Sequence, residues 1–116
     1  RNAPGIVAEG DLYPEVITLE SGVASLPQIH HALVGMGKGK YLLRNGIEYT
    51  LRRGLVIAPG ASLVITGDEV SSLKLSQDYN GIIVNAGKLY AVDSEIIGWN
   101  EKNNAPADFT YEERYQ

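Results

Sequence analysis

The chain has 116 residues, 44% of them hydrophobic and 21% charged, with a formal net charge of -4 and a pI near 5.1. This composition is typical of one globular domain and excludes a disordered chain, and its acidic balance argues against nucleic acid as a partner. Cysteine is absent, which excludes disulfides and thiolate metal sites, and no apolar run approaches the roughly 18 residues of a membrane span.

The first third of the chain predicts a lead-in, one strand and one helix. Residues 1–14 are rich in proline, glycine and charge and predict an irregular lead-in. Residues 15–20 alternate as a strand does. The helix is expected around residues 25–36, with Ser25 as its amino-terminal cap and Pro27 in its first turn. Its apolar stripe comprises Ile29, Leu33 and Met36.

From Tyr41 onward, short β-forming runs follow one another without an intervening helix. Glycine, asparagine, proline and aspartate separate the runs, and the segment from residue 100 to 116 is polar again. The runs are YLLRN, EYTLR, LVIA, SLVIT, LKLS, IIVN and KLYAVDSEIIGW. The chain is therefore expected to be mainly β.

Two of these runs repeat. GLVIAPG at residues 54–60 resembles GIIVNAG at residues 81–87, with Leu55 aligned to Ile82, and a one-residue shift follows the second glycine. A repeat of this length with several short strands favours a solenoid, in which each copy stacks on the one before. An antiparallel sandwich or barrel also has short strands at such spacing, so the pattern leaves both architectures open.

Few residues suggest catalysis. His30 and His31 are adjacent on the expected helix and point about 100° apart, so they cannot close on one metal ion. The glycine-rich stretch at residues 35–40 follows a helix, whereas phosphate-binding loops open one. Asp93 and Glu95 lack an evident partner for acid–base work and are expected on the solvated surface. Trp99, the only tryptophan, is expected to be structural, as a core plug or at the edge of a coil.

A basic and aromatic stripe is the remaining candidate site. On a solenoid, residues from successive coils align, and cations beside tyrosines would suit an acidic polysaccharide through ionic and stacking contacts. Scattered surface charge is the alternative. The candidate polysaccharide contacts are Arg44, Arg52, Lys74, Lys88 and Tyr90.

The stretch LKLSQDYNGIIVNAGKLYAVDSEIIGWNEKNNAPADF, residues 73–109, resembles the amino-terminal coils of the bacterial mannuronan C5-epimerases of the alginate export machinery. Its most specific parts are VNAGKLYAVDSEIIGWNE and NNAPA, and the resemblance runs from about Glu15 to the end. It implies a right-handed parallel β-helix, and we expect the helix around residues 25–36 to cap the amino end of its core. Residues 15–99 would be the cap and first coils, and residues 100–116 a polar loop cut before further coils.

The resemblance also implies a function. The family is periplasmic and converts β-D-mannuronate to α-L-guluronate within the polymer without an organic cofactor. Acidic polysaccharide is therefore the expected partner, with other alginate export proteins as further candidates. The family's signature, Asp-Pro-His-Asp-Arg-Ser, is absent from this chain, so no catalytic residue is carried over and the chain alone is expected to be inactive.

Two other functions stay open. A non-catalytic carbohydrate-binding or scaffold solenoid would have no signature string anywhere in the protein. A polysaccharide lyase of the same fold would abstract the same proton but eliminate the 4-linked sugar, which produces unsaturated ends that absorb ultraviolet light.

Overall fold

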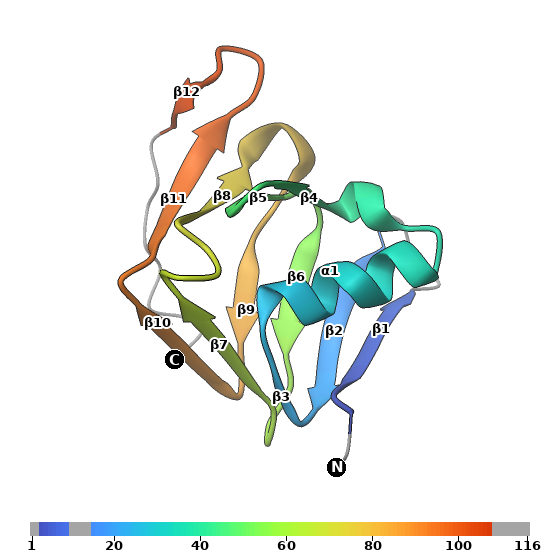
Figure 1. The fold of residues 1–116 in the computed structure, drawn as a ribbon. Coiled ribbons are helices and arrows are strands. Elements are labelled where there is room, and N and C mark those ends of the chain that lie inside the picture. The colour runs from blue at the N-terminus through green and yellow to red at the C-terminus, as the bar shows by residue number, and fades with distance from the viewer. Residues whose placement is uncertain (1–2, 10–14, 108–116) are drawn as a thin grey trace.

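A computed structural model describes residues 3–9 and 15–107, and over these residues the chain is mostly β-structure with one α-helix (Figure 1). No helix in this described part is long and apolar enough to cross a membrane. The strands form three sheets. Sheet 1 contains β1 (Gly5–Glu9), β2 (Val16–Ser21), β6 (Gly54–Ile57) and β9 (Ile83–Asn85). Sheet 2 contains β3 (Val23–Ala24), β7 (Ser62–Thr66) and β10 (Lys88–Val92). Sheet 3 contains β4 (Leu42–Asn45), β5 (Glu48–Leu51), β8 (Ser72–Ser76), β11 (Glu95–Asn100) and β12 (Ala105–Pro106).

The chain visits the three sheets in the same order three times. The first circuit is β2, β3 and β5, the second is β6, β7 and β8, and the third is β9, β10 and β11. Strands of successive circuits pair in parallel in every sheet, whereas β1, β4 and β12 add to the sheets as antiparallel strands. These parallel ladders exclude an antiparallel sandwich for the described residues.

The core consists of rows of aliphatic side chains that run across the circuits. In sheet 1, Ile17 lies opposite Leu55 and Leu55 opposite Ile83. The first two of these side chains are fully buried, and Ile83 is buried to 9% exposure. In the third circuit Leu89 and Ile96 are only partly buried against the core. Burial therefore decreases toward the third circuit, where no described strand lies beyond β9 and β10 in their sheets.

The α-helix α1 (Leu26–Gly35) covers the opposite end of the core. It contacts β1 and β4, the outermost strands of sheets 1 and 3, and it buries Leu26, Ile29 and Leu33. Its start is a capping box: the Ser25 hydroxyl accepts a hydrogen bond from the Gln28 backbone N–H at 3.3 Å, and the Ser25 N–H donates to the Gln28 side chain at 2.9 Å. The predicted helix is confirmed.

The predicted apolar stripe of α1 needs one correction. Met36, assigned to the stripe, is the carboxy-terminal cap residue of the helix and is 40% exposed. Leu26, at the first helical position, is fully buried instead. The last helical residue is Gly35, one residue before Met36, and Gly37 adopts a positive φ of 77° directly after the cap.

The repeat is real, but its predicted register is one residue wrong. Leu55 pairs with Ile83 rather than with Ile82. The two glycines that suggested the alignment have different structural roles. Gly54 lies opposite Val16 within sheet 1, whereas a Cβ at Gly81 would overlap the carbonyl oxygen of Leu51. Gly81 therefore serves a close backbone approach and marks no strand position.

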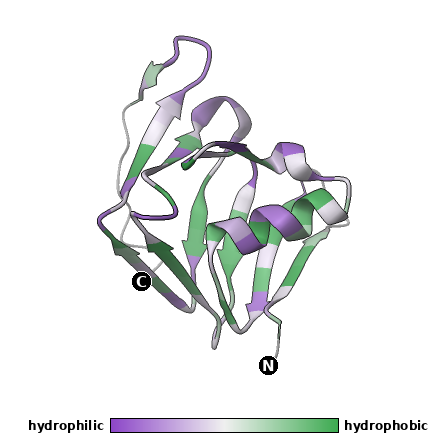
Figure 2. Cartoon of the chain, viewed as in Figure 1, coloured by the Kyte–Doolittle hydropathy of each residue, from purple (hydrophilic) through white to green (hydrophobic). Residues whose placement is uncertain are grey.

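Both ends of the described chain are more regular than predicted. Residues 5–9 lie in the lead-in predicted to be irregular, yet they form β1 antiparallel to β2. Residues 105–106, in the predicted polar loop, form β12 and pair with the end of β11. The turn between β11 and β12 is hydrophilic (Figure 2). Residues 1–2, 10–14 and 108–116, which belong to the same two predicted segments, lie outside the described residues.

Candidate functional site

The outward face of sheet 3 carries cations beside aromatic rings. Along each strand the side chains alternate, so the buried Tyr49 and Leu73 of one row are followed by Thr50 and Lys74 of the next, outward row. The same row continues to Ile97 on β11. Two residues further on, Ser76 pairs with Trp99, which places the tryptophan on this outward face.

Lys74 and Trp99 form a cation–π pair on this face. The Lys74 Nζ lies 4.0 Å from the centroid of the Trp99 ring, well within the distance at which an ammonium is attracted by the ring. The same Nζ lies 3.5 Å from a carboxylate oxygen of Glu48. The Lys74 side chain is 21% exposed and the Glu48 side chain 54% exposed, so the carboxylate side of this ion pair is open to solvent and the pair is expected to contribute little to stability.

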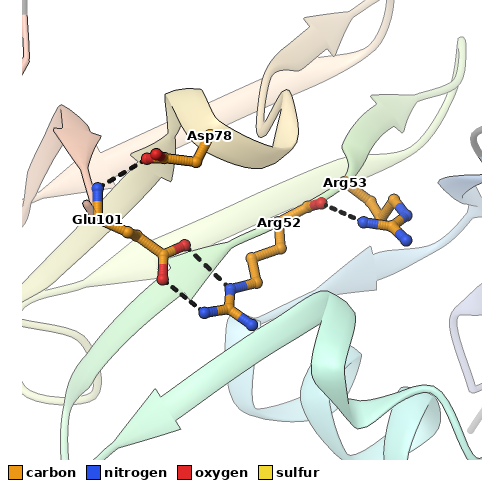
Figure 3. A network of polar contacts seen from close by, with 4 residues as sticks. All are labelled: Arg52, Arg53, Asp78 and Glu101. Atoms are coloured by element: carbon orange, nitrogen blue, oxygen red, sulfur yellow. Dashed lines mark hydrogen bonds and ion pairs between the residues drawn. The ribbon is translucent and has the colours of Figure 1, made fainter.

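A polar network joins the three circuits at the corner where sheet 3 leads into sheet 1 (Figure 3). Arg52 follows β5, and its Nε and Nη2 donate to the two carboxylate oxygens of Glu101 at 2.9 and 2.5 Å. Asp78, in the 3-10 turn η2 (Gln77–Tyr79), accepts a hydrogen bond from the Glu101 backbone N–H at 2.7 Å. The Arg52 guanidinium also stacks 4.4 Å from the centroid of the Tyr79 ring. We call Arg52, Asp78, Tyr79 and Glu101 the corner network.

The corner network changes the protonation behaviour of its carboxylate. The Arg52 guanidinium, bonded to both oxygens of Glu101, holds the pKa of that carboxyl below its ordinary value of 4.5. Both side chains are mostly covered, at 26% exposure for Arg52 and 22% for Glu101. Glu101 therefore stays ionised at neutral pH, and the Arg52 guanidinium is already occupied by a carboxylate of the chain itself.

A second cluster lies next to the corner network, around Tyr41 in the 3-10 turn η1 (Gly39–Tyr41). The Tyr41 hydroxyl donates to Glu15, and Lys38 donates to Glu15 at 3.2 Å and to the backbone carbonyl of Ala8 in β1. The Arg53 guanidinium stacks 4.4 Å from the centroid of the Tyr41 ring. Hydrogen bonds from Tyr41 and Lys38 lower the pKa of Glu15. This cluster ties β1 and the start of β2 to the segment that follows α1.

The five candidate polysaccharide contacts do not share one face. Lys74 lies on β8 of sheet 3, and Arg52 lies in the corner directly after β5 of the same sheet. Lys88 and Tyr90 lie on β10, on the outward face of sheet 2, opposite Ser62 and Val64. Tyr90 is 50% exposed. Arg44, on β4, donates to the Gly46 carbonyl at 3.2 Å and lies 5.7 Å from the Tyr49 ring centroid. Lys74 contacts Trp99 and Glu48, whereas Arg52 contacts Glu101 and Tyr79, so these two cations have separate partners.

Two residues of this region were not anticipated. Trp99 was expected to be structural, and it lies on the outward face beside Lys74. Residues two positions apart in a strand share a face, so the position of Trp99 relative to Ile97 could have indicated this orientation. Glu101 lies in the segment predicted to be a polar loop. No local signal connects it to Arg52, because the two residues are 49 positions apart.

The other residues singled out in the sequence do not form a site. His30 packs at the edge of the buried Tyr49 ring with 6.2 Å between centroids, and burial lowers its pKa. His31 and Asp93 are exposed, as is Glu95 at the start of β11. Within the described residues, no group of three or more histidine, aspartate or glutamate side chains could hold a metal ion.

Comparison with known proteins gives one consistent family name. The chain is 36% identical over 104 residues, 90% of its length, to mannuronan C5-epimerase AlgG of Azotobacter vinelandii. It is 41% identical over 61 residues, 53% of its length, to mannuronan C5-epimerase of Pseudomonas putida, and 32% identical over 96 residues, 83% of its length, to that of Pseudomonas aeruginosa. These matches cover 19%, 12% and 17% of the relatives, so the chain spans about one fifth of the length of the enzymes it matches.

The fold agrees with this relationship. A crystal structure of the periplasmic alginate epimerase AlgG matches 84% of this chain and 22% of that chain, with a TM-score of 0.71 and 22% sequence identity. At this identity the likeness shows that the fold is shared. No protein-family model matches the chain.

Proposed function

Starting from the homology of this chain to the mannuronan C5-epimerases, we propose that it forms the opening section of an enzyme of that kind, which acts on polymannuronate in the periplasm. The observation that carries this proposal is the 36% identity that extends over 90% of the chain. The match covers only 19% of the relative. In this proposal the isomerase activity therefore belongs to the whole enzyme and not to this section by itself.

The architecture that we propose is a right-handed parallel β-helix. Three circuits with parallel pairing in three sheets support it, and residues 15–99 would contain the cap and the first coils. The helix α1 covers the end at which β1 and β4 are outermost, as a cap does. The partly exposed Leu89 and Ile96 of the third circuit leave apolar surface on which a further coil would stack.

The chemistry explains why this section would be non-catalytic. Epimerisation at C5 removes a proton from one face of the sugar and returns a proton to the other. The carbanion formed at C5 is stabilised only if a cation neutralises the adjacent carboxylate while a base takes the proton. Two of the groups that such a step would use are engaged elsewhere: His30 packs against Tyr49, and Arg52 is bonded to Glu101. The reacting groups would lie in other parts of the enzyme.

The section would instead contribute to holding the polymer. Arg44, Arg52, Lys74, Lys88 and Tyr90 are the proposed pool of contacts with acidic polysaccharide. Lys88 and Tyr90 lie on sheet 2, whereas Lys74 lies on sheet 3. Because these are different faces, a single polymer chain would contact one of the two groups. Other proteins of alginate export are further proposed partners.

A chimera tests the function. The segment of the Azotobacter vinelandii enzyme that aligns with this chain is replaced by the corresponding segment of this chain, and the product is incubated with polymannuronate. Proton NMR detects guluronate, and ultraviolet absorbance detects the unsaturated ends that a lyase would produce. We expect guluronate from the chimera and from the parent enzyme, and none from the 116-residue chain alone.

The other outcomes separate the competing functions. A folded chimera that makes no guluronate would refute the epimerase role and favour a carbohydrate-binding or scaffold solenoid. Unsaturated ends in place of guluronate would favour a lyase. Guluronate from the chain alone would show that it carries catalytic groups, with His30, His31 and Asp93 the first to be substituted.

A further inference from the structure

We propose that Lys74 and Trp99 form a subsite for one uronate residue on the outward face of sheet 3. The Lys74 ammonium would bind the sugar carboxylate, and the exposed part of Trp99 would contact the sugar ring. This inference rests on the function proposed above and specifies which face of the chain meets the polymer.

The first argument is that Lys74 is held in place before any ligand binds. Its ammonium lies 4.0 Å from the Trp99 ring centroid, and β8 and β11, which carry the two residues, are paired in parallel. A cation fixed over a ring loses less side-chain entropy on binding than a free lysine does. An ammonium has three N–H donors, and the ring and one neighbouring carboxylate leave it able to bind another anion.

The second argument is the carboxylate already present. Glu48 lies 3.5 Å from the Lys74 Nζ, so the position of its oxygen marks a place that an anion occupies next to this cation. The Glu48 side chain is 54% exposed and makes a single contact with the ammonium, which makes the pair weak and readily exchanged. Arg52 differs, because both oxygens of Glu101 bind its guanidinium and both side chains are mostly covered.

The third argument is the chemistry of the two outward faces. A sugar chain has many hydroxyl groups, which lose hydrogen bonds to water unless the protein replaces them. The sheet 3 face offers the hydroxyl of Thr50 in the same row as Lys74, and that of Ser72 two residues before Lys74 on β8. The sheet 2 face also has hydroxyls, from Ser62 opposite Lys88 and Thr66 opposite Val92, so the faces differ in how the cation is held: Lys74 lies over the Trp99 ring, whereas Tyr90 on sheet 2 has Val64 opposite it.

The chain supplies its own reporter for the test. Trp99 is the only tryptophan, so intrinsic tryptophan fluorescence reports on this position alone. The 116-residue chain is titrated with oligomannuronate, and with β-1,4-linked oligomannose of equal length, which has the same backbone without carboxylates. Isothermal titration calorimetry on the same samples detects binding at any other position.

Four variants distinguish the two faces. Lys74→Gln removes the proposed cation and is expected to raise the Kd for oligomannuronate by about tenfold, the loss expected for a charged hydrogen bond. Glu48→Gln removes the competing carboxylate and is expected to lower the Kd by about two- to fivefold. Lys88→Gln tests the competing face on sheet 2, and we expect it to raise the Kd by less than Lys74→Gln does. Lys40→Gln is the matched control, because Lys40 is an exposed lysine of η1 outside the proposed contacts, and we expect its Kd to stay within about twofold of the original value. Circular dichroism confirms that each variant is folded.

The expected result is a saturable change in Trp99 fluorescence with oligomannuronate, a much weaker response to oligomannose, and the stated order of the variants. Binding that Lys74→Gln leaves unchanged, binding that Lys88→Gln abolishes, or no saturable binding at all would overturn the subsite. A chimera that makes guluronate while Lys74→Gln binds normally would refute only the subsite. Binding that depends on Lys74 together with an inactive chimera would refute only the epimerase role.

Discussion

The ion pair between Arg52 and Glu101 is expected to stabilise the stack of circuits measurably, and Glu101→Ala tests this. The substitution removes both hydrogen bonds to the guanidinium but keeps the backbone N–H that donates to Asp78. Exposed ion pairs contribute about 0.2–1 kcal/mol, whereas breaking a buried pair costs about 3–5 kcal/mol. With side-chain exposures of 26% and 22%, this pair lies between the two classes. We expect Glu101→Ala to lower the free energy of unfolding by about 2 kcal/mol.

Urea denaturation followed by far-ultraviolet circular dichroism measures this loss. Glu95→Ala is the matched control, because Glu95 is an exposed carboxylate at the start of β11, the strand that Glu101 directly follows, and its loss is expected to change stability by less than about 0.5 kcal/mol. A double-mutant cycle with Arg52→Ala should give a coupling energy of about 1.5 kcal/mol. A stabilising role for the pair would be refuted if Glu101→Ala lowered the free energy of unfolding no more than Glu95→Ala does, or if the coupling energy were near zero. Either result would show that the corner network does not stabilise the fold.

Two further predictions concern pH and backbone packing. Because the pKa of Glu101 is lowered below 4.5 in the folded chain, the unfolded chain binds more protons as the pH falls below that value, so folding stability should decline there. The decline should be shallower in Glu101→Ala, and parallel pH profiles of the free energy of unfolding would contradict this cause. Gly81→Ala should destabilise the chain by more than about 2 kcal/mol, because its Cβ would overlap the Leu51 carbonyl oxygen. Gly35→Ala, inside α1 with nothing within 4 Å of the added Cβ, should instead raise the melting temperature, and equal effects of the two substitutions would refute the packing argument.

The elements that could be predicted from sequence are those specified by local chemistry. The helix followed from Ser25 as cap, Pro27 in the first turn and the spacing of Ile29 and Leu33, which the structure confirms as a capping box and a buried stripe. The strands followed from alternation, as in SLVIT, where Leu63 and Ile65 are buried and their neighbours are not. Such signals depend on residues a few positions apart, and one sequence displays them directly.

The register of the repeat could not be predicted in the same way. Matching glycines suggested that Leu55 aligns with Ile82, whereas Leu55 pairs with Ile83. Gly81 is required because a Cβ there would overlap the Leu51 carbonyl oxygen, which belongs to a different circuit. The 3-10 turn η2 also lengthens the corner before β9. A one-residue error of this kind moves every side chain to the opposite face, so alignment by letter is a weak guide to orientation in a strand.

The candidate site depended on contacts between circuits. The composition of the stripe, cations near tyrosines, was visible, but the separation of Lys88 and Tyr90 from Arg52 and Lys74 required the sheet topology. The partner of Arg52 lies 49 residues away, beyond any local pattern. The orientation of Trp99 is an exception, because its alternation with the buried Gly98 on β11 is a local signal that could have indicated the outward face.

The central claim is that this chain serves as the opening section of a mannuronan C5-epimerase, and the proton NMR spectrum of polymannuronate after incubation with the chimera tests it most directly. The claim predicts guluronate signals with the folded chimera and none with the 116-residue chain alone. An unchanged polymannuronate spectrum with a chimera shown to be folded, beside an active parent enzyme, would contradict it.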